Sequence, residues 1–126
     1  MKEYTIANFQ SYCFKLALMI FQERDTSREY TDADELLDAL IDNVHETVDC
    51  LEDVIYYHNA WNVVDMFWRN KSSDLDAAQE ELHDMGCEFE SLEKYKTQLS
   101  YQLFYNEVRF ALENICRDFV ESVEAA

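Results

Sequence analysis

The chain contains no proline and only one glycine, Gly86, among its 126 residues. Tight β-turns depend on these two residue types, so a sandwich or barrel rich in hairpins is disfavoured. One glycine also leaves no material for the glycine-rich loops that hold phosphates, which excludes P-loop and dinucleotide-binding folds. We therefore expect a fold built from helices.

Apolar residues recur every three or four positions along most of the chain, which is the spacing of one helix face. The first such stretch, residues 6–21, is apolar nearly all round, so we expect it to lie centrally. A polar loop follows from about residue 24 to residue 30, and Thr31 or Asp32 is expected to cap the next helix. The expected core face of that second helix is Leu37, Leu40 or Ile41, Val44, Val48 and Leu51.

Three more helical stretches follow. The third is expected to place on one side Tyr57, Ala60, Trp61, Val64, Phe67 and Trp68. Residues 70–73 predict a loop with a serine cap, and the fourth helix is expected to end at Gly86. That helix is expected to bury Leu75, Ala78, Leu82 and Met85. The last helix should begin near Ser91 and bury Tyr101, Phe104, Val108, Leu112, Ile115, Phe119 and Val123. We expect one all-α domain, residues 1–126, forming a compact bundle of about five helices with a long C-terminal helix.

The net charge is concentrated in the middle of the chain. Ten basic and 27 acidic residues give a formal charge of −17. Residues 29–93 hold 19 of the acids and only two bases, Arg69 and Lys71, so this segment carries the entire net charge. A surface of this charge excludes nucleic acid as its direct ligand over most of its area.

The acidic residues of the expected second helix stand in a row. Asp34, Asp38, Asp42 and Glu46 are spaced four apart, which puts about 6 Å between neighbours on one helix face. Asp49 and Asp53 continue the row after a step of three. Like charges at this spacing destabilise a helix by a few tenths of a kcal/mol per pair, so five pairs cost roughly 1–2 kcal/mol. Helix stability therefore does not explain the row.

We interpret the row as one part of a surface that imitates the phosphates of a nucleic acid, which carries one charge per about 3.4 Å on each strand. The expected partner is a basic DNA-binding protein or nuclease complex. The candidate binding residues are Asp32, Asp34, Glu35, Asp38, Asp42, Glu46, Asp49, Glu52, Asp53, Asp74, Asp76, Glu80, Glu81 and Asp84. The plainer alternative is an acidic face that only keeps the protein soluble.

Two carboxylate-x-x-His pairs raise the question of a metal site. They are Asp42 with His45 and Glu80 with His83. Ferritin-like di-iron bundles also need an inward-facing glutamate on each of two further helices. The first helix has no acid within its apolar stretch, so we expect no metal ligand and no cofactor.

The pairs Glu35 with Asp38 and Glu46 with Asp49 match the E-x-x-D spacing used by all-α, Mg²⁺-dependent nucleotide pyrophosphohydrolases. A substrate phosphate would also need lysine or arginine nearby, and this part of the chain has neither. We therefore expect no catalytic residue and no enzymatic activity. The pyrophosphohydrolase class stays an alternative, as does an acidic helical adaptor that binds a basic protein.

The four cysteines are Cys13, Cys50, Cys87 and Cys116, and none forms a C-x-x-C pair. We expect buried free thiols, which are typical of a cytoplasmic protein. The apolar stretches are too short to span a bilayer, and we expect no signal peptide before them. The expected compartment is the cytoplasm of the host cell, without membrane contact.

Aromatic residues gather at Tyr56, Tyr57, Trp61, Phe67 and Trp68, and core packing is their first interpretation. Two adjacent tyrosines on a helix do not both face one core, so one ring is expected to be exposed or at a subunit contact. A homodimer would lengthen the acidic surface.

Residues 32–40, with the sequence D-A-D-E-L-L-D-A-L, resemble the Ocr family of phage antirestriction proteins, which mimic DNA. That family has a similar run at the start of an acidic helix and a Tyr-Tyr pair on the next helical stretch, here Tyr56-Tyr57. The interval before the pair is longer in this chain, and an acidic C-terminal tail is absent. The resemblance implies an all-helical, dimeric mimic of bent DNA that occupies the groove of restriction–modification enzymes. Small acidic phage proteins also include anti-CRISPR inhibitors, so the kind of host defence complex is left open.

Overall fold

The computed structural model describes residues 6–27, 29–49, 60–86 and 91–124. The regular elements in these ranges are helices: α1 (Ile6–Gln22), α2 (Ala33–Asp49), α4 (Ala60–Asn70), α5 (Ser72–Asp84) and α6 (Leu92–Glu124). This confirms the all-α bundle of about five helices with a long C-terminal helix. No helix in the described ranges has the length and apolar character needed to cross a membrane.

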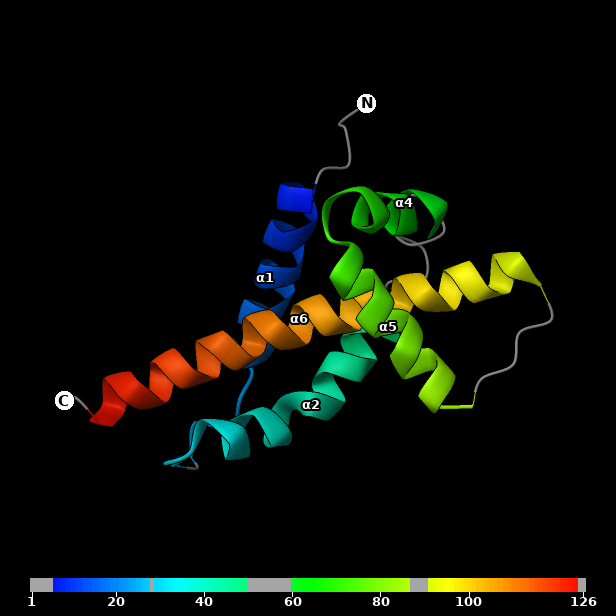
Figure 1. Ribbon diagram of the computed structural model, residues 1–126. Coiled ribbons are helices and arrows are strands. Elements are labelled where there is room, and N and C mark those ends of the chain that lie inside the picture. The colour runs from blue at the N-terminus through cyan, green and yellow to red at the C-terminus, as the bar shows by residue number, and fades with distance from the viewer. Residues whose placement is uncertain (1–5, 28, 50–59, 87–90, 125–126) are drawn as a thin grey trace.

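Helix α6 is the axis of the bundle. Its 33 residues span about 50 Å, and the other four described helices all pack against it (Figure 1). Helix α1 contacts α6 from Phe104, which lies against Phe9, to Phe119, whose ring centroid is 5.2 Å from that of Phe21. The expectation that the first helix is central is therefore wrong. α6 packs against all four other described helices, whereas α1 leaves Phe14 and Leu18 exposed.

Three fully buried phenylalanines tie α1, α4 and α6 together. The ring centroid of Phe9 lies 5.2 Å from that of Phe67, edge to face, and 4.6 Å from that of Phe104. Burial of each such ring contributes about 1.5–3 kcal/mol to folding. The hydrophobic core around them also takes in Leu36 and Val44 from α2 and Leu75 and Leu82 from α5.

Several helix ends fall where the sequence predicts them. The Asp34 backbone N–H donates to the carboxylate of Asp32 at 2.9 Å, so Asp32 caps α2. The Lys94 N–H donates to Ser91 Oγ at 3.2 Å at the start of α6. Gly86 has φ +70° and donates its N–H to the His83 carbonyl at 3.0 Å, which ends α5.

The expected loop at residues 70–73 is wrong. α4 continues through Asn70, α5 starts at Ser72, and only Lys71 separates them, without a side-chain cap. The backbone of Lys71 serves both helices. Its N–H donates to the Phe67 carbonyl at 2.7 Å, and its carbonyl accepts from the Asp74 N–H at 3.1 Å. The junction therefore needs no serine.

Some expected core positions are exposed. Trp68 is 66% exposed because it follows the buried Phe67 and so points away from the face that packs on α6. Val123 and Met85 are exposed at the ends of their helices, and Tyr101, Ile115 and Phe119 are only half-buried. Core positions that the sequence reasoning missed are Leu36, Val63, Met66, Leu99, Leu103 and Val120. The calls on Cys50, Leu51, Tyr56, Tyr57 and Cys87 lie outside the described residues, as do the side chains of Ala60 and Trp61.

Candidate acidic binding surface

Helix α2 separates its acidic and apolar residues onto opposite faces. Asp34, Asp38, Asp42 and Glu46 are all exposed; we call these four residues the α2 row. With about 100° of rotation per residue, the row lies opposite the buried residues. These buried residues are Leu36, Leu37, Leu40, Val44 and Val48. The row is about 18 Å long from its first to its last residue.

The remaining candidates around α2 differ in how far they can be placed. Glu35 is exposed in the first turn, beside the row, and Asp32 caps the helix. Asp49 is the last residue of α2, but its side chain lies outside the part of the chain that the structure describes. Glu52 and Asp53 lie outside the described residues. The row is therefore established over three turns of the helix.

Helix α5 carries a second row. Asp76, Glu80 and Asp84 are exposed and spaced four apart; we call them the α5 row. Asp74 and Glu81 lie instead on the flank that faces α6. The Asp74 carboxylate is 3.9 Å from Lys71 Nζ, and Glu81 Oε2 accepts from Gln102 Nε2 at 2.6 Å. The five α5 candidates therefore divide into an outward row and a pair on the flank beside α6.

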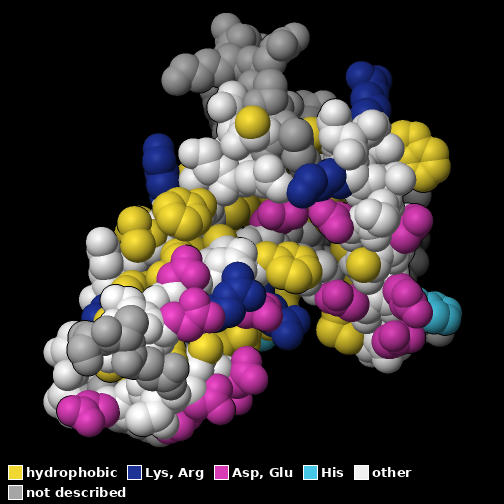
Figure 2. Space-filling view, turned by 60° about the vertical axis from the view of Figure 1, so that its left-hand side comes forward, with side chains coloured by type: hydrophobic (Ala, Val, Ile, Leu, Met, Phe, Trp, Pro, Cys, Tyr) yellow, Lys and Arg dark blue, Asp and Glu magenta, His cyan; other side chains and the backbone are white. Residues whose placement is uncertain are grey.

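Acidic side chains do not form one continuous ridge on the face shown in Figure 2. Acidic side chains gather there in two groups, and hydrophobic and basic side chains lie between them. Helices α2 and α5 each pack against α6, so the two rows stand on separate helices. The surface thus offers two separate anionic tracks.

The α2 row does not serve the stability of its own helix. Asp34 and Glu35 lie in the first turn, where the helix dipole favours a negative charge. Asp38, Asp42 and Glu46 lie beyond that turn, and α2 contains no lysine or arginine to pair with them. Three neighbouring pairs in the row therefore cost the helix about 1 kcal/mol.

The histidines of the two carboxylate-x-x-His pairs are exposed and lie on different helices. The His45 ring stacks on Tyr105 of α6, with centroids 4.4 Å apart and planes 19° apart. Within the described residues, no group of three or more His, Cys, Asp or Glu is arranged to hold a metal ion.

Cys13 and Cys116 are buried free thiols, as expected for these two residues. Burial raises the pKa of Cys13 far above its usual value, and the nearby Glu107 carboxylate adds to the effect. Burial also raises the pKa of Cys116, to about 11, although Arg24 opposes the rise. Both thiols are therefore protonated and unreactive at neutral pH.

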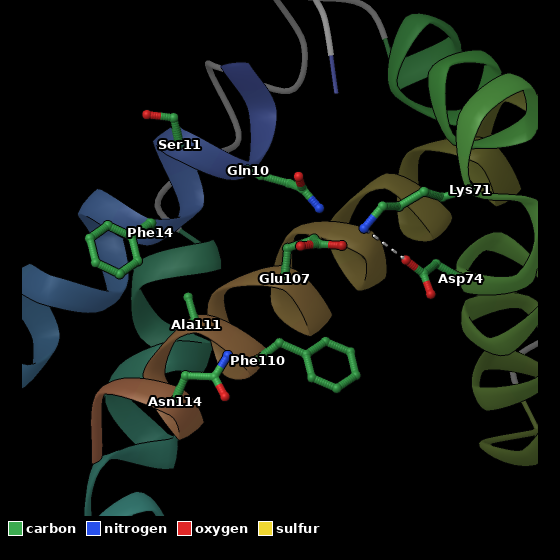
Figure 3. Close-up of a pocket in the computed structure, with 9 residues that line it drawn as sticks. All are labelled: Gln10, Ser11, Phe14, Lys71, Asp74, Glu107, Phe110, Ala111 and Asn114. Atoms are coloured by element: carbon green, nitrogen blue, oxygen red, sulfur yellow. Dashed lines mark ion pairs between the residues drawn. The ribbon is translucent and has the colours of Figure 1, made fainter. Parts of the chain in front are cut away.

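The sequence reasoning missed a hollow beside α6, formed where α1, the start of α5 and α6 meet. Its volume is about 580 Å³, and Glu107 projects into it between Gln10 of α1 and Lys71 (Figure 3). Phe110 lies at its mouth with 60% of its surface exposed. One signal in the sequence could have found it. Phe110 falls between the core positions Val108 and Leu112, and so off the core face of its helix.

Comparison with known proteins adds no relative. No protein-family model matches the chain, and neither a curated protein nor a solved structure matches it. The likeness of residues 32–40 to the antirestriction family therefore stays a prediction from the sequence.

Proposed function

We propose that the protein is a DNA mimic that inhibits a DNA-binding defence complex of the host cell. It occupies the basic DNA-binding groove of a restriction–modification enzyme or a CRISPR effector stoichiometrically, in the host cytoplasm, and catalyses no reaction. The observation that carries this proposal is the α2 row, in which four exposed carboxylates stand on the face opposite the core.

The dimensions of the α2 row suit a groove that binds DNA. Its length of about 18 Å corresponds to roughly five phosphate-to-phosphate spacings along one strand at about 3.4 Å each. The α5 row supplies a second track on a separate helix, as a duplex supplies a second strand. Self-association would lengthen both tracks.

The arrangement of the charges favours this proposal over a face that serves solubility alone. Solubility depends on net charge and is satisfied by acids and bases interspersed over the surface. Here the acids of α2 repel one another at a cost of about 1 kcal/mol, which a mixed face would avoid. A basic groove that neutralises the row would remove this repulsion on binding.

The same exposure counts against the hydrolase alternative. Glu35 and Asp38 lie on the outward face of α2 and not in a cavity where a nucleotide could be enclosed. An acidic adaptor that binds a basic protein would use the same acidic surface as a DNA mimic. The two functions differ in whether DNA competes with the chain for the partner.

Capture from host lysate with competing DNA separates these two functions. The immobilised chain is incubated with lysate of a host that carries restriction–modification and CRISPR systems, with and without excess duplex DNA. A DNA mimic retains a DNA-handling complex that DNA displaces. A partner that stays bound in excess DNA would contradict the proposal and favour the adaptor.

A further inference from the structure

The hollow at Glu107 belongs to a longer groove along α6. Two smaller hollows, of about 70 and 160 Å³, adjoin it, and all three are lined by Phe110. The first two share Asp74 and Glu107, and the last two share Glu81 and Asn106. We call this continuous depression the Phe110 groove.

Aromatic rings are exposed at the groove although the core takes other rings in completely. Phe9, Phe67 and Phe104 are fully buried, whereas Phe110 is 60% exposed and Phe14 is 49% exposed. Figure 3 places Phe14 on α1 and Phe110 on α6 at the edge of the largest hollow. An exposed ring face carries the negative side of the aromatic quadrupole and attracts cations.

The charged groups of the groove point to the same kind of ligand. The carboxylates of Asp74, Glu81, Glu107 and Glu113 line the three hollows, against the two basic residues Lys71 and Arg109. The pair between Lys71 and Asp74 is 3.9 Å long and partly exposed, so a second cation can compete for Asp74 at little cost.

Glu107 is a half-buried carboxyl group of the groove. Burial raises its pKa, and Asp74 adds to the rise, while Lys71 and a hydrogen bond from Gln10 oppose it. A cation placed in the groove would offset the loss of solvent around this carboxylate.

An arginine fits this combination better than a lysine. Its planar guanidinium can stack on a ring and still donate to a carboxylate in its own plane. The chain itself uses the stacking chemistry elsewhere. The Arg24 guanidinium carbon lies 4.1 Å from the ring centroid of Phe21 and 4.7 Å from that of Phe119.

We propose that the Phe110 groove binds an arginine side chain of the basic partner, stacked on Phe110 and paired with Glu107. This inference rests on the proposed function for the source of the arginine, because a DNA-binding groove is rich in that residue. The acidic rows supply many weak, exposed charge pairs, whereas the groove supplies one enclosed contact that depends on shape.

The direct test uses three capped tripeptides as probes: Gly-Arg-Gly, Gly-Lys-Gly and Gly-citrulline-Gly. Each is titrated into the ¹⁵N-labelled full-length chain and followed by NMR. We expect the arginine peptide to shift the side-chain amides of Gln10 and Asn114, which line the groove. The uncharged citrulline peptide should not shift them, and the lysine peptide should bind about fivefold more weakly.

Variants identify the ring as the cause. Phe110→Ala and Phe110→Leu should each weaken arginine-peptide binding by about fivefold or more, and the leucine variant preserves apolar area without a ring face. Trp68→Ala removes another exposed aromatic residue, on α4 and outside the groove lining, and should change nothing. Equal binding by all four proteins, or shifts confined to α2, would overturn the assignment.

The outcome is separable from that of the proposed function. If the arginine peptide leaves the groove unperturbed while DNA still displaces the captured partner, the groove assignment fails and the DNA mimic stands. If the groove binds the peptide but DNA does not displace the captured partner, the function fails and the groove assignment stands.

Discussion

Replacing two residues in the middle of the α2 row, Asp38→Lys together with Asp42→Lys, should stabilise the fold. Both side chains are exposed opposite the core, so no packing is lost. Both lie beyond the first turn, so no favourable interaction with the helix dipole is lost either. The perturbation therefore acts on the electrostatics of the row alone.

The magnitude follows from counting neighbours on the helix. Position 38 turns from repelling to attracting Asp34 and Glu35, and position 42 does the same toward Glu46. The contact between positions 38 and 42 stays repulsive. Each reversal is worth about 0.4–1 kcal/mol, so the three together stabilise the fold by about 1–3 kcal/mol at low salt. The melting temperature should rise by at least about 3 °C.

The assay compares this double variant with Asp65→Lys/Asp118→Lys, which makes the same change in net charge at exposed positions outside the two rows. Asp65 stands four residues before Arg69, so the control loses one attractive pair, and Asp118 stands three residues before Glu121, so it also reverses one repulsive pair. The two changes oppose each other, and the control should gain little stability. Thermal unfolding at low salt, followed by circular dichroism, measures both. A fall in melting temperature of the row variant, or an equal rise in the control, would refute the reasoning.

The same pair of variants separates stability from function. The row variant should bind the captured partner at least about tenfold more weakly, because two carboxylates of the track become like charges to a basic groove. The control should bind nearly as well as the wild-type chain. Undiminished binding by the more stable row variant would exclude α2 as the contact surface.

Three further results are expected. Affinity for the partner should fall steeply as salt rises, because exposed charges are screened over about 10 Å at 0.1 M; an affinity independent of salt, measured by titration, would contradict the electrostatic account. In a Cys50→Ser/Cys87→Ser variant, Cys13 and Cys116 should react with a thiol reagent at least about 100-fold more slowly in the folded than in the unfolded chain. Both thiols are buried, and burial raises their pKa values, to about 11 for Cys116. Glu107→Gln should raise the melting temperature at neutral pH, because the raised pKa of Glu107 means that its charged form destabilises the fold. This gain in melting temperature should shrink as the pH falls through the folded and then the unfolded pKa of Glu107. A gain that grows on acidification would contradict the prediction.

The helices could be predicted because each has a local cause in the sequence. Asp32, Ser91 and Gly86 form the caps and the stop that their residue types favour, and the periodicity of α6 marks Phe104 and Val108 as core. These features depend on residues within a few positions of one another, so one sequence is enough to find them.

The arrangement of the helices could not be predicted in the same way. α1 is apolar nearly all round, yet the axis of the bundle is α6, against which the other four described helices pack. The central position depends on the length of a helix and on how the other helices pack, which residue spacing within one helix does not indicate. The exposure of Trp68 beside the buried Phe67 likewise depends on which side of α4 meets α6.

The candidate site could be predicted only where it depends on residues close together in the sequence. The α2 row follows from residue spacing on a single helix. The separation of the α2 and α5 rows, and the groove that joins Glu107 and Phe110 to Lys71, depend on how three helices meet.

The most direct test of the DNA-mimic proposal is equilibrium competition between the chain and duplex DNA for the purified partner. The labelled chain is titrated with the partner at several fixed concentrations of DNA, and its fluorescence anisotropy is recorded. Mutual exclusion predicts that the apparent Kd of the chain rises in proportion to free DNA, with no ternary complex. An apparent Kd that does not change with DNA, or a stable complex of all three, would contradict the proposal that the acidic rows occupy the DNA-binding groove.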